Sequence, residues 1–317
     1  MRLIQSVADI RPEDRGASAA MGNFDGVHRG HASVIDCARA PIGGAEAPLG
    51  VVTFEPHPRE VFAPDAPPFR LMNMDARRHR LQKLGVDILF QLPFDRALAS
   101  LTAEEFARDV LAEGLGLRRV VVGADFRFGK GREGDAQMLV ELGARFGFET
   151  VIAPMLAGPE GRVSSTAIRE ALKAGEPRAA ARMLGHWHRL DGVVSHGDKR
   201  GRELGFPTAN VILEGLLLPR FGVYAVEVEV YDGPHKGRYG GAASLGVRPT
   251  FGVNAPNLET FLFDFSGDLY GAEVSVALIS WLRPELKFDG IEPLIEQMHA
   301  DCALARERLA ERVDPAA

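Results

Sequence analysis

The sequence Met21-Gly22-Asn23-Phe24-Asp25-Gly26-Val27-His28-Arg29-Gly30-His31 is the most informative stretch of the chain. A short apolar run at 17–21 precedes it, and residues 32–38 carry apolar side chains at helical spacing. A strand, a glycine-rich turn and the start of a helix are therefore predicted within a few residues. The three glycines allow a positive φ or a close approach of the backbone to a ligand.

This turn is a candidate site for phosphate chemistry. The following helix directs unpaired N–H groups and the positive end of its dipole toward the turn, which favours an anion. His28 and His31 are three residues apart and are expected on one face of that helix start. Donors in such positions stabilise a phosphoryl group as its charge rises in a transition state. Two surface histidines without a catalytic role are the competing interpretation, and this stretch alone leaves both open.

Length and composition indicate a globular protein of two domains. The chain has 317 residues, of which 46% are hydrophobic and 25% charged, so it can bury substantial cores. Its formal net charge of −6 gives no reason to expect a nucleic-acid or anionic-membrane partner. We expect small-molecule substrates and a monomer or weak homo-oligomer.

Cysteine usage and the N-terminus predict a cytoplasmic protein. Cys37 and Cys302 are the two cysteines and lie far apart in sequence, so a disulfide framework or a cysteine-based metal site is not expected. Residues 1–6 lack the apolar core of a signal peptide, and apolar runs in the sequence are shorter than a transmembrane helix.

Strand-like and helix-like segments alternate up to about residue 185. Strands are predicted at 49–54, 86–90, 119–122 and 149–153, and helices at 75–84, 102–111, 135–146, 166–173 and 177–184. The alternation predicts a doubly wound, mostly parallel α/β sheet. Ligands bind such sheets beyond the carboxyl ends of the strands. The turns at 22–31, 55–58 and 123–129 each follow a strand, so we expect them at one edge.

A second candidate phosphate site lies at the helix predicted for 166–173. Ser164, Ser165 and Thr166 stand at its start, with Arg169 in its first turn. Hydroxyl groups there can cap the helix or bind phosphate oxygens, and the arginine supplies positive charge. Capping alone is the competing interpretation. A Walker A motif is absent from the sequence, because the lysine of residues 128–131 is not followed by Ser or Thr.

Beyond residue 185 the pattern changes to short strands. Residues 223–230, 260–265 and 274–282 are strand-like and are separated by Gly, Pro and Asn turns, which predicts a small antiparallel β-barrel. Apolar side chains at helical spacing from residue 291 to 309 predict a terminal amphipathic helix packed on it. His186-Trp187-His188, at the junction, is predicted to be a linker packed on the surface.

A third candidate site begins in the basic, glycine-rich loop at 197–205. Phe206-Pro207 follows it, and then Thr208 and Asn210 lie on one side of an extended segment. Hydroxyl and amide oxygens are plausible ligands for Mg²⁺. Glu259, just before an apolar strand, is a candidate general base. A basic hairpin and a strand-edge charge are the corresponding non-catalytic interpretations.

These motifs carry a family resemblance in the first half. His28-Arg29-Gly30-His31 and residues 164–169 resemble the nucleotidyltransferase superfamily, marked by an HxGH turn and a later Ser/Thr-rich, arginine-containing helix start. Residues 22–28, 53–58 and 123–129 resemble, more specifically, the FMN adenylyltransferase module of prokaryotic bifunctional FAD synthetases. The resemblance implies a domain over residues 1–185 that transfers AMP from ATP to FMN and releases pyrophosphate.

The resemblance also implies roles for individual residues. His28 and His31 would contact the ATP phosphates and stabilise the transfer. Ser164, Thr166 and Arg169 would hold the β and γ phosphates. The other positions that it assigns to ATP are Gly22, Phe24, Asp25 and Ser165, and those that it assigns to the flavin are Pro56, His57, Pro58, Asp125 and Phe126.

The second half resembles the riboflavin kinase module. The matching segments are 205–210, 222–224, 244–250, 259–265 and 282–288. This resemblance implies a kinase domain over residues 186–317, in which Thr208 and Asn210 hold Mg²⁺ and Glu259 takes the proton of the riboflavin 5′-hydroxyl. Gly201 to Gly205 would wrap the ATP phosphates, and Arg283 would help to form the flavin pocket.

Together the two resemblances predict a bifunctional enzyme that converts riboflavin to FMN and FMN to FAD. ATP would be the co-substrate of both steps and Mg²⁺ the metal. Two alternatives remain at this stage. In one, a single module is active; in the other, the chain is a flavin-binding sensor or carrier without turnover.

Overall fold

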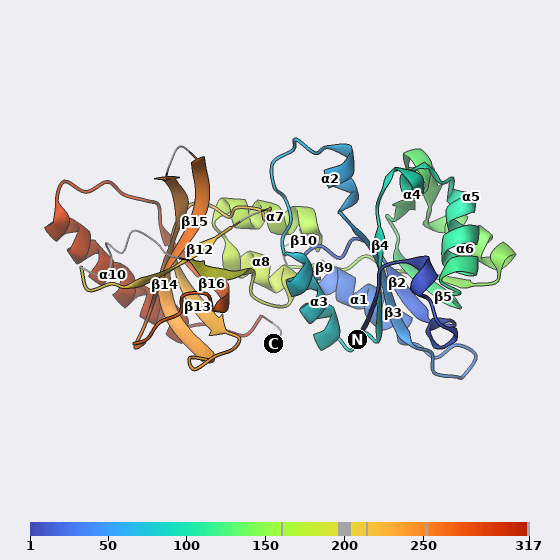
Figure 1. Cartoon of the computed structure of the whole chain (residues 1–317), viewed down its shortest axis with the longest axis horizontal. Helices are drawn as coiled ribbons and strands as arrows, with labels where there is room; N and C mark the ends of the chain where they lie inside the picture. The colour runs from blue at the N-terminus through green and yellow to red at the C-terminus, as the bar shows by residue number, and fades with distance from the viewer. Residues whose placement is uncertain (160, 196–203, 214, 251–252, 316–317) are drawn as a thin grey trace. The chain divides into compact units, whose positions relative to one another are not determined.

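The computed structural model of the chain describes residues 1–159, 161–195, 204–213, 215–250 and 253–315 (Figure 1). They form two units. The first consists of Met1–Pro67 and Arg77–Val163, and the second of Pro68–Ala76 and Ser164–Ala317. Within the described residues, no helix is both long and apolar enough to cross a membrane.

The first unit is built on a six-stranded parallel sheet. Its spatial order is β1-β4-β3-β2-β5-β8, and all five pairings are parallel. The strands are β1 (Arg2–Ile4), β2 (Ser18–Met21), β3 (Leu49–Glu55), β4 (Ile88–Pro93), β5 (Arg119–Gly123) and β8 (Glu149–Ala153). The predicted parallel α/β sheet is confirmed. The edge strand β1 was not predicted.

Helices connect the strands of this sheet. They are α1 (Arg29–Ala38), α2 (Pro58–Phe62), α3 (Met74–Lys83), α4 (Arg96–Ser100), α5 (Ala103–Glu105), which continues as a π-helical segment (Phe106–Gly114), and α6 (Ala136–Phe146). The predicted capping box at the start of α5 is present: Thr102 and Glu105 bond each other's backbone N–H. The π-helical segment and α6 supply Leu111 and Leu139 to the main core. Helix α1 packs on β2, β3, β5 and β8.

Short elements complete the first unit. They are the 3₁₀ turns Val7–Asp9, Pro12–Asp14 and Lys130–Arg132, the paired strands β6 (Arg127–Phe128) and β7 (Gly134–Asp135), and the hairpin of β9 (Ala157–Gly158) with β10 (Gly161–Arg162).

The strand order creates a switch point at the centre of the sheet. From β2 the chain continues to β3 and β4 on one side, whereas β5 and β8 lie on the other side of β2. Connections that leave β2 and β5 in opposite directions open a crevice beyond the carboxyl ends of these strands. Because the strands are parallel neighbours, the turns after β2, β3 and β5 lie at the same edge, as predicted.

The second unit contains a closed antiparallel barrel of order β11-β12-β15-β14-β13-β16 (Figure 1). The strands are β11 (Arg189–Ser195), β12 (Thr208–Ile212), β13 (Gly222–Val230), β14 (Gly237–Thr250), β15 (Val253–Leu262) and β16 (Glu273–Arg283). Val211, Tyr224, Leu245 and Leu258 are fully buried within it. Helix α10 (Ile291–Ala310) packs on the outside through Ala305. The predicted barrel and terminal helix are confirmed.

Helices α7 (Ser165–Ala174) and α8 (Pro177–Leu184) also belong to the second unit. The Arg220 backbone N–H donates to Leu172 O at 2.9 Å, and Arg220 Nη1 donates to Ala174 O at 3.2 Å. The same guanidinium lies 4.1 Å from the centre of the Trp281 ring on β16. The C-terminal end of α7 is therefore attached to the barrel through Arg220. The second unit, which contains this barrel, is named the barrel unit.

The predicted surface linker at 186–188 is wrong for His188. This residue is only 3% exposed, and the Leu278 N–H donates to its backbone carbonyl at 3.0 Å, which brings it into the barrel. Its Nε2 is buried and has no hydrogen-bond partner among the described residues. Burial, and secondarily His186 nearby, lower the pKa of His188 to about 3. Because histidine is polar, the sequence did not indicate that His188 is buried.

Candidate active sites

His28 and His31 form one structure at the start of α1. His28 is the N-cap of this helix, and its Nδ1 accepts a hydrogen bond from the His31 backbone N–H at 3.1 Å. The two imidazole rings stack with centroids 3.6 Å apart and an interplanar angle of 11°. The prediction that both histidines lie on one face is confirmed.

Burial controls the protonation of His31. His28 is only 6% exposed, and the Nδ1 atom of His31 is buried without a hydrogen-bond partner among the described residues. Burial first, and then the neighbouring His28, lower the pKa of His31 well below its ordinary value. His31 is therefore neutral at neutral pH, and an anionic ligand beside it would favour its protonation.

Positive φ angles in this turn are not confined to glycine. Gly26 has φ of 86°, but Phe24 and Val27 also have positive φ, at 50° and 37°. At Gly30 a Cβ atom would lie 3.1 Å from the His28 ring, so the absence of a side chain there permits the histidine stack. The Phe24 ring is 1% exposed and packs 5.0 Å from the His31 ring, so its contact with a nucleotide would come from the backbone.

The turn after β3 presents a histidine and an exposed aromatic ring. His57 is the N-cap of α2; its Nδ1 accepts from the Arg59 N–H at 3.0 Å, and Glu60 accepts from the His57 N–H at 3.1 Å. Pro56 is exposed and Pro58 begins the helix. Phe62, at the end of α2, is 71% exposed, and its ring lies 5.7 Å from that of Phe94.

Phe62 and Phe94 were not singled out from the sequence. The available signal was a phenylalanine four residues beyond Pro58, close to the predicted rim. An exposed aromatic ring that packs edge-to-face against a second ring offers an apolar surface to a flat ligand.

The turn after β5 carries Asp125 and Phe126. Asp125 is exposed and forms an ion pair with Arg162 of the β9–β10 hairpin. The Phe126 ring stacks on Phe128 at 5.8 Å. Arg162 was not identified from the sequence, since the residues of the pair are 37 positions apart.

The second phosphate motif lies in the second unit. Ser164 is the N-cap of α7, and its Oγ accepts from the Ala167 N–H at 3.2 Å. Ser165 begins the helix and Thr166 is exposed. Arg169 Nε donates to Phe69 O at 2.8 Å, and its guanidinium lies 5.4 Å from the centre of the Phe69 ring.

The last residue of the first unit, Val163, lies near the histidine turn of the same unit. Val163, the residue before Ser164, belongs to the first unit, and its carbonyl oxygen lies 3.6 Å from the position that a Cβ of Gly30 would take.

Asn210 and Glu259 meet on the outer face of the barrel. They are directly opposite each other in the β12–β15 pairing. Asn257, two residues before Glu259, joins them: its Nδ2 donates to Asn210 Oδ1 at 3.1 Å and to Glu259 Oε1 at 3.3 Å. Asn257 was not predicted; its position two residues from Glu259 on one strand was the signal.

Thr208 is the first residue of β12 and has the same orientation as Asn210 by strand alternation. Phe206 anchors this strand start, because its buried ring packs 5.2 Å from Phe261 and 5.0 Å from His299 of α10. Gly205 precedes it with φ of 83°. Gly201 lies outside the described residues.

Arg283 binds an acid on the terminal helix. Its Nε and Nη2 donate to Asp301 Oδ1 and Oδ2 at 2.8 and 2.6 Å, and its Nη1 donates to Pro284 O at 2.8 Å. Asp301 is 7% exposed. The bidentate pair joins β16 to α10. The contact of Arg283 with the flavin stays a prediction.

The segment after Arg283 lies over the barrel strand β14. A Cβ on Gly246 would lie 2.2 Å from Glu285 Oε1, so this carboxylate occupies the space above the glycine. Gly246 pairs with Asn257 in the β14–β15 ladder, so Glu285 lies over the residue opposite Asn257.

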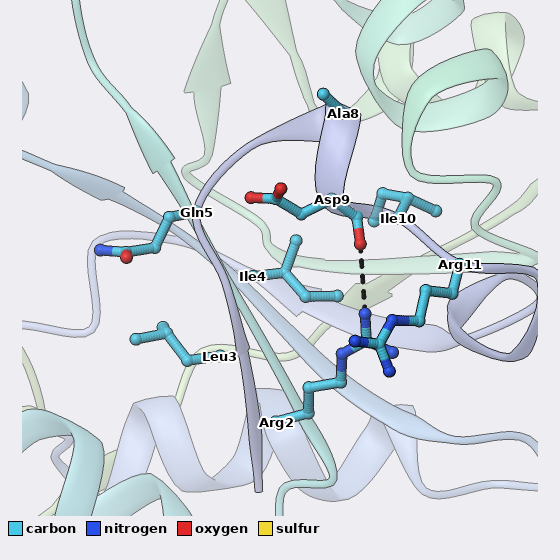
Figure 2. A pocket seen from close by; sticks show the side chains of 8 residues that line it. All are labelled: Arg2, Leu3, Ile4, Gln5, Ala8, Asp9, Ile10 and Arg11. Atoms are coloured by element: carbon cyan, nitrogen blue, oxygen red, sulfur yellow. Dashed lines mark hydrogen bonds between the residues drawn. The ribbon is translucent and has the colours of Figure 1, made fainter.

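A cavity of about 480 Å³ opens at the edge strand β1 (Figure 2). Arg2 lies in it and donates to Asp9 O at 3.1 Å. The eight residues that line this cavity are Arg2, Leu3, Ile4, Gln5, Ala8, Asp9, Ile10 and Arg11. None of them was predicted for either site.

Comparisons with known proteins match each half of the chain to a different family model. An FAD synthetase family model matches residues 10–167, and a riboflavin kinase model matches residues 184–309. Among curated proteins, the bifunctional riboflavin kinase/FMN adenylyltransferase of Pseudomonas fluorescens is 42% identical over 96% of this chain and 97% of its own. The protein of that name from Escherichia coli K12 is 39% identical over 97% of both chains.

A solved structure resembles the whole chain. It is described as a macrolide-efflux protein from Streptococcus pneumoniae, and it aligns with a TM-score of 0.84 and 32% identity over 96% of this chain and 98% of its own. The two family models and the full-length curated relatives decide the assignment. This chain belongs to the family of bifunctional riboflavin kinases/FMN adenylyltransferases.

Proposed function

We propose that this chain makes FAD in two ATP-dependent steps, with one site in each half. Riboflavin would be phosphorylated to FMN at the barrel, and FMN would be adenylylated to FAD at the parallel sheet. The observation that carries the proposal is the match of an FAD synthetase model and a riboflavin kinase model to successive ranges of one chain. We propose a boundary between the two domains at residues 185 and 186.

In adenylyl transfer, a phosphate oxygen of FMN attacks the α-phosphorus of ATP, and the bond to pyrophosphate breaks. Because the substrate supplies the nucleophile, the chain has to orient the reactants and stabilise charge. His28 and His31 take this role at the ATP phosphates, which the helix start behind them supports. The turn from Gly22 through Phe24 to Asp25 would contact the nucleotide.

The start of α7 would hold the β and γ phosphates. The residues assigned there are Ser164, Ser165, Thr166 and Arg169. A helix N-terminus favours such an anion, because the first N–H groups have no partner within the helix and the dipole is positive there. The flavin is assigned to the neighbouring turns through Pro56, His57, Pro58, Asp125 and Phe126, and we add the exposed ring of Phe62.

In the kinase step, the 5′-oxygen of riboflavin attacks the γ-phosphorus of ATP, and ADP leaves. Glu259 is the general base that takes the hydroxyl proton, and Asn257 orients its carboxylate through the 3.3 Å hydrogen bond. Gly201 to Gly205 are assigned to the phosphates, and Arg283 to the flavin pocket.

Thr208 and Asn210 fit a magnesium ion in their donor chemistry. A hydroxyl and an amide oxygen are hard ligands, and Asn210 Oδ1 accepts one hydrogen bond, so a second lone pair is left for a cation. The described residues contain no group of three or more His, Cys, Asp or Glu side chains arranged to hold a metal. Bound Mg²⁺ would neutralise phosphate charge, while Thr208 and Asn210 fix its place on the barrel.

We further propose that the protein acts in the cytoplasm on small molecules, as a monomer or weak homo-oligomer without nucleic-acid or membrane partners. The formal net charge of −6 and the two free, widely separated cysteines support this assignment.

One assay tests the function. Purified protein is incubated with riboflavin, ATP and Mg²⁺, and the flavins are separated by chromatography with time. FMN that appears first and FAD that follows establish both activities. FMN alone would show a silent first half, and bound riboflavin without product would favour a sensor or carrier.

Two conservative variants assign the sites. In His28→Asn the amide can still cap α1, so loss of the imidazole should reduce FAD formation at least 100-fold and leave FMN formation unchanged. In Glu259→Gln the amide oxygen can still accept from Asn257, so FMN formation from riboflavin should fall at least 100-fold while FMN is still converted to FAD. Each variant is the control of the other. Normal kinase turnover by Glu259→Gln would refute the base assignment.

A further inference from the structure

Arg77 bonds to two of the turns at the rim of the parallel sheet. It projects from α3 and is 3% exposed. Its Nη1 donates to the backbone carbonyl of Asn23 at 3.3 Å, and its Nη2 donates to Glu55 Oε2 at 2.7 Å. A buried guanidinium requires such partners, because an uncompensated buried charge is strongly unfavourable.

The Asn23 carbonyl is held from a second direction. Thr53 Oγ1, on the central strand β3, donates to it at 3.3 Å, and Thr53 is completely buried. The next residue, Phe24, has a positive φ, and so does Val27. Non-glycine residues persist in that conformation only where the surroundings enforce it. The two buried donors, Thr53 and Arg77, hold the Asn23 carbonyl in place at the entrance of the turn and so stabilise this backbone conformation.

Glu55 connects Arg77 to the other turn. It is the last residue of β3 and directly precedes Pro56-His57-Pro58. Its ion pair with Arg77 joins side chains that are 4% and 24% exposed. One guanidinium therefore fixes the start of the histidine turn and the start of the His57 turn with respect to each other.

We propose that Arg77 is a positioning residue for adenylyl transfer. It touches no substrate in this role; it sets the separation between the turn assigned to ATP and the turn assigned to FMN. The inference rests on those two assignments under the proposed function. Because an in-line displacement requires the attacking oxygen close to the α-phosphorus, a shift of about 1 Å between the turns can lower the rate about 100-fold.

The test uses the full-length enzyme and the variants Arg77→Met and Arg77→Lys. Methionine keeps an apolar stem of similar reach without donors, whereas lysine keeps the charge and can donate to either acceptor. The kcat of FAD formation and the KM values for ATP and FMN are measured, with riboflavin kinase turnover in the same preparation. We expect kcat for FAD to fall about 100-fold in Arg77→Met with smaller changes in KM, partial recovery in Arg77→Lys, and unchanged kinase turnover.

Lys83→Met is the matched control. Lys83 lies on the same helix and is exposed, so loss of its charge should leave both activities as in the wild type. If Arg77→Met does not fold, Thr53→Val replaces it, since this nearly isosteric change removes the other donor to Asn23; it should lower kcat for FAD about tenfold.

Three results would overturn the inference. They are a wild-type kcat in Arg77→Met, or in Thr53→Val where that variant replaces it; an equal loss of kinase and adenylyltransferase turnover, which would indicate general damage; and no recovery in Arg77→Lys. Failure of the proposed function is recognised separately, because the wild-type enzyme itself would then form no FAD.

Discussion

At the scale of single residues, burial lowers the pKa of His31 and of His188 and so keeps both side chains neutral. His188 is the clearest case, with a pKa lowered to about 3 and a buried Nε2 that has no partner among the described residues. In the unfolded chain a histidine has a pKa near 6.5. The unfolded state therefore binds the proton first as the pH falls, and protonation of His188 opposes folding.

This gives a prediction for acid stability. Below pH about 6.5 the free energy of unfolding should fall by about 1.4 kcal/mol per pH unit through His188, until the pH approaches its folded pKa of about 3. Urea unfolding of the wild type and His188→Leu at pH 6.5 and 5 checks this. The wild type should lose about 2 kcal/mol more than the variant over that interval. Parallel losses would contradict it, and the comparison at pH 7 isolates the packing effect of the substitution.

The sequence predicted those candidate site residues that belong to one short, continuous motif. His28 and His31, or Ser164 to Thr166, are recognisable because a helix start needs donors and caps at fixed spacing. Arg77 and Asn257 were missed because their roles come from contacts across the fold, with Asn23 and Asn210 respectively. These contact partners are 54 and 47 positions away in the sequence, so only the fold brings them together.

At the scale of elements, the bidentate pair between Arg283 and Asp301 attaches α10 to β16. The side chains are 18% and 9% exposed, and Gln297 donates to the same carboxylate at 2.9 Å. Asp301→Ala would leave a mostly buried guanidinium without its partner. We expect the free energy of unfolding to fall by about 3 kcal/mol, because removal of one member of a buried pair strands the other charge.

Asp264→Asn is the control for this prediction, because asparagine tolerates the positive φ of 55° at this position. Asp264 pairs with Arg306 of the same helix, but the two side chains are 79% and 51% exposed, so solvent already screens the interaction. Urea denaturation of both variants should show a clear loss for Asp301→Ala and little change for Asp264→Asn. Equal stabilities of the two variants would contradict the assigned importance of the Arg283 pair.

Elements with capped helical periodicity were predicted closely, and barrel strands less so. Helix α8 and strand β8 have the predicted bounds, since a terminal glycine or a short apolar run defines their ends. Strand β14 was not predicted, because Gly240, Gly241 and Gly246 interrupt its pattern. The structure explains two of them: a Cβ would lie 2.6 Å from Phe261 O at Gly241 and 2.2 Å from Glu285 at Gly246.

At the scale of the whole molecule, the order of the sequence does not separate the two units. Residues 68–76 come from the first half but belong to the second unit, where the Leu217 N–H donates to Arg70 O at 2.8 Å and Phe69 accepts from Arg169. Helices α7 and α8 precede the predicted boundary at 185, yet they also belong there. Periodicity predicts the type of an element and carries no information on which core it joins.

The final prediction concerns where the barrel unit can be cut. A fragment 186–317 loses α7 and α8, which bury Ile168, Leu172, Met183 and Leu184, and it leaves the Arg220 donors without Leu172 O and Ala174 O. Each large apolar side chain contributes about 1.5–3 kcal/mol when buried, so a fragment 164–317 should be clearly more stable. We expect its melting temperature to be higher by about 5 °C or more, since 1 kcal/mol shifts the transition of a domain of this size by a few degrees.

Thermal unfolding of the two fragments, followed by circular dichroism, decides the matter. Neither fragment contains residues 68–76, so the comparison isolates the two helices. Leu172→Ala in the longer fragment should lower its melting temperature toward that of the shorter one, because it removes a fully buried side chain of α7. Equal melting temperatures of the two fragments would mean that the helix with the phosphate motif does not stabilise the barrel unit. A difference would mean that the helix assigned to adenylyl transfer is part of the fold that carries the kinase.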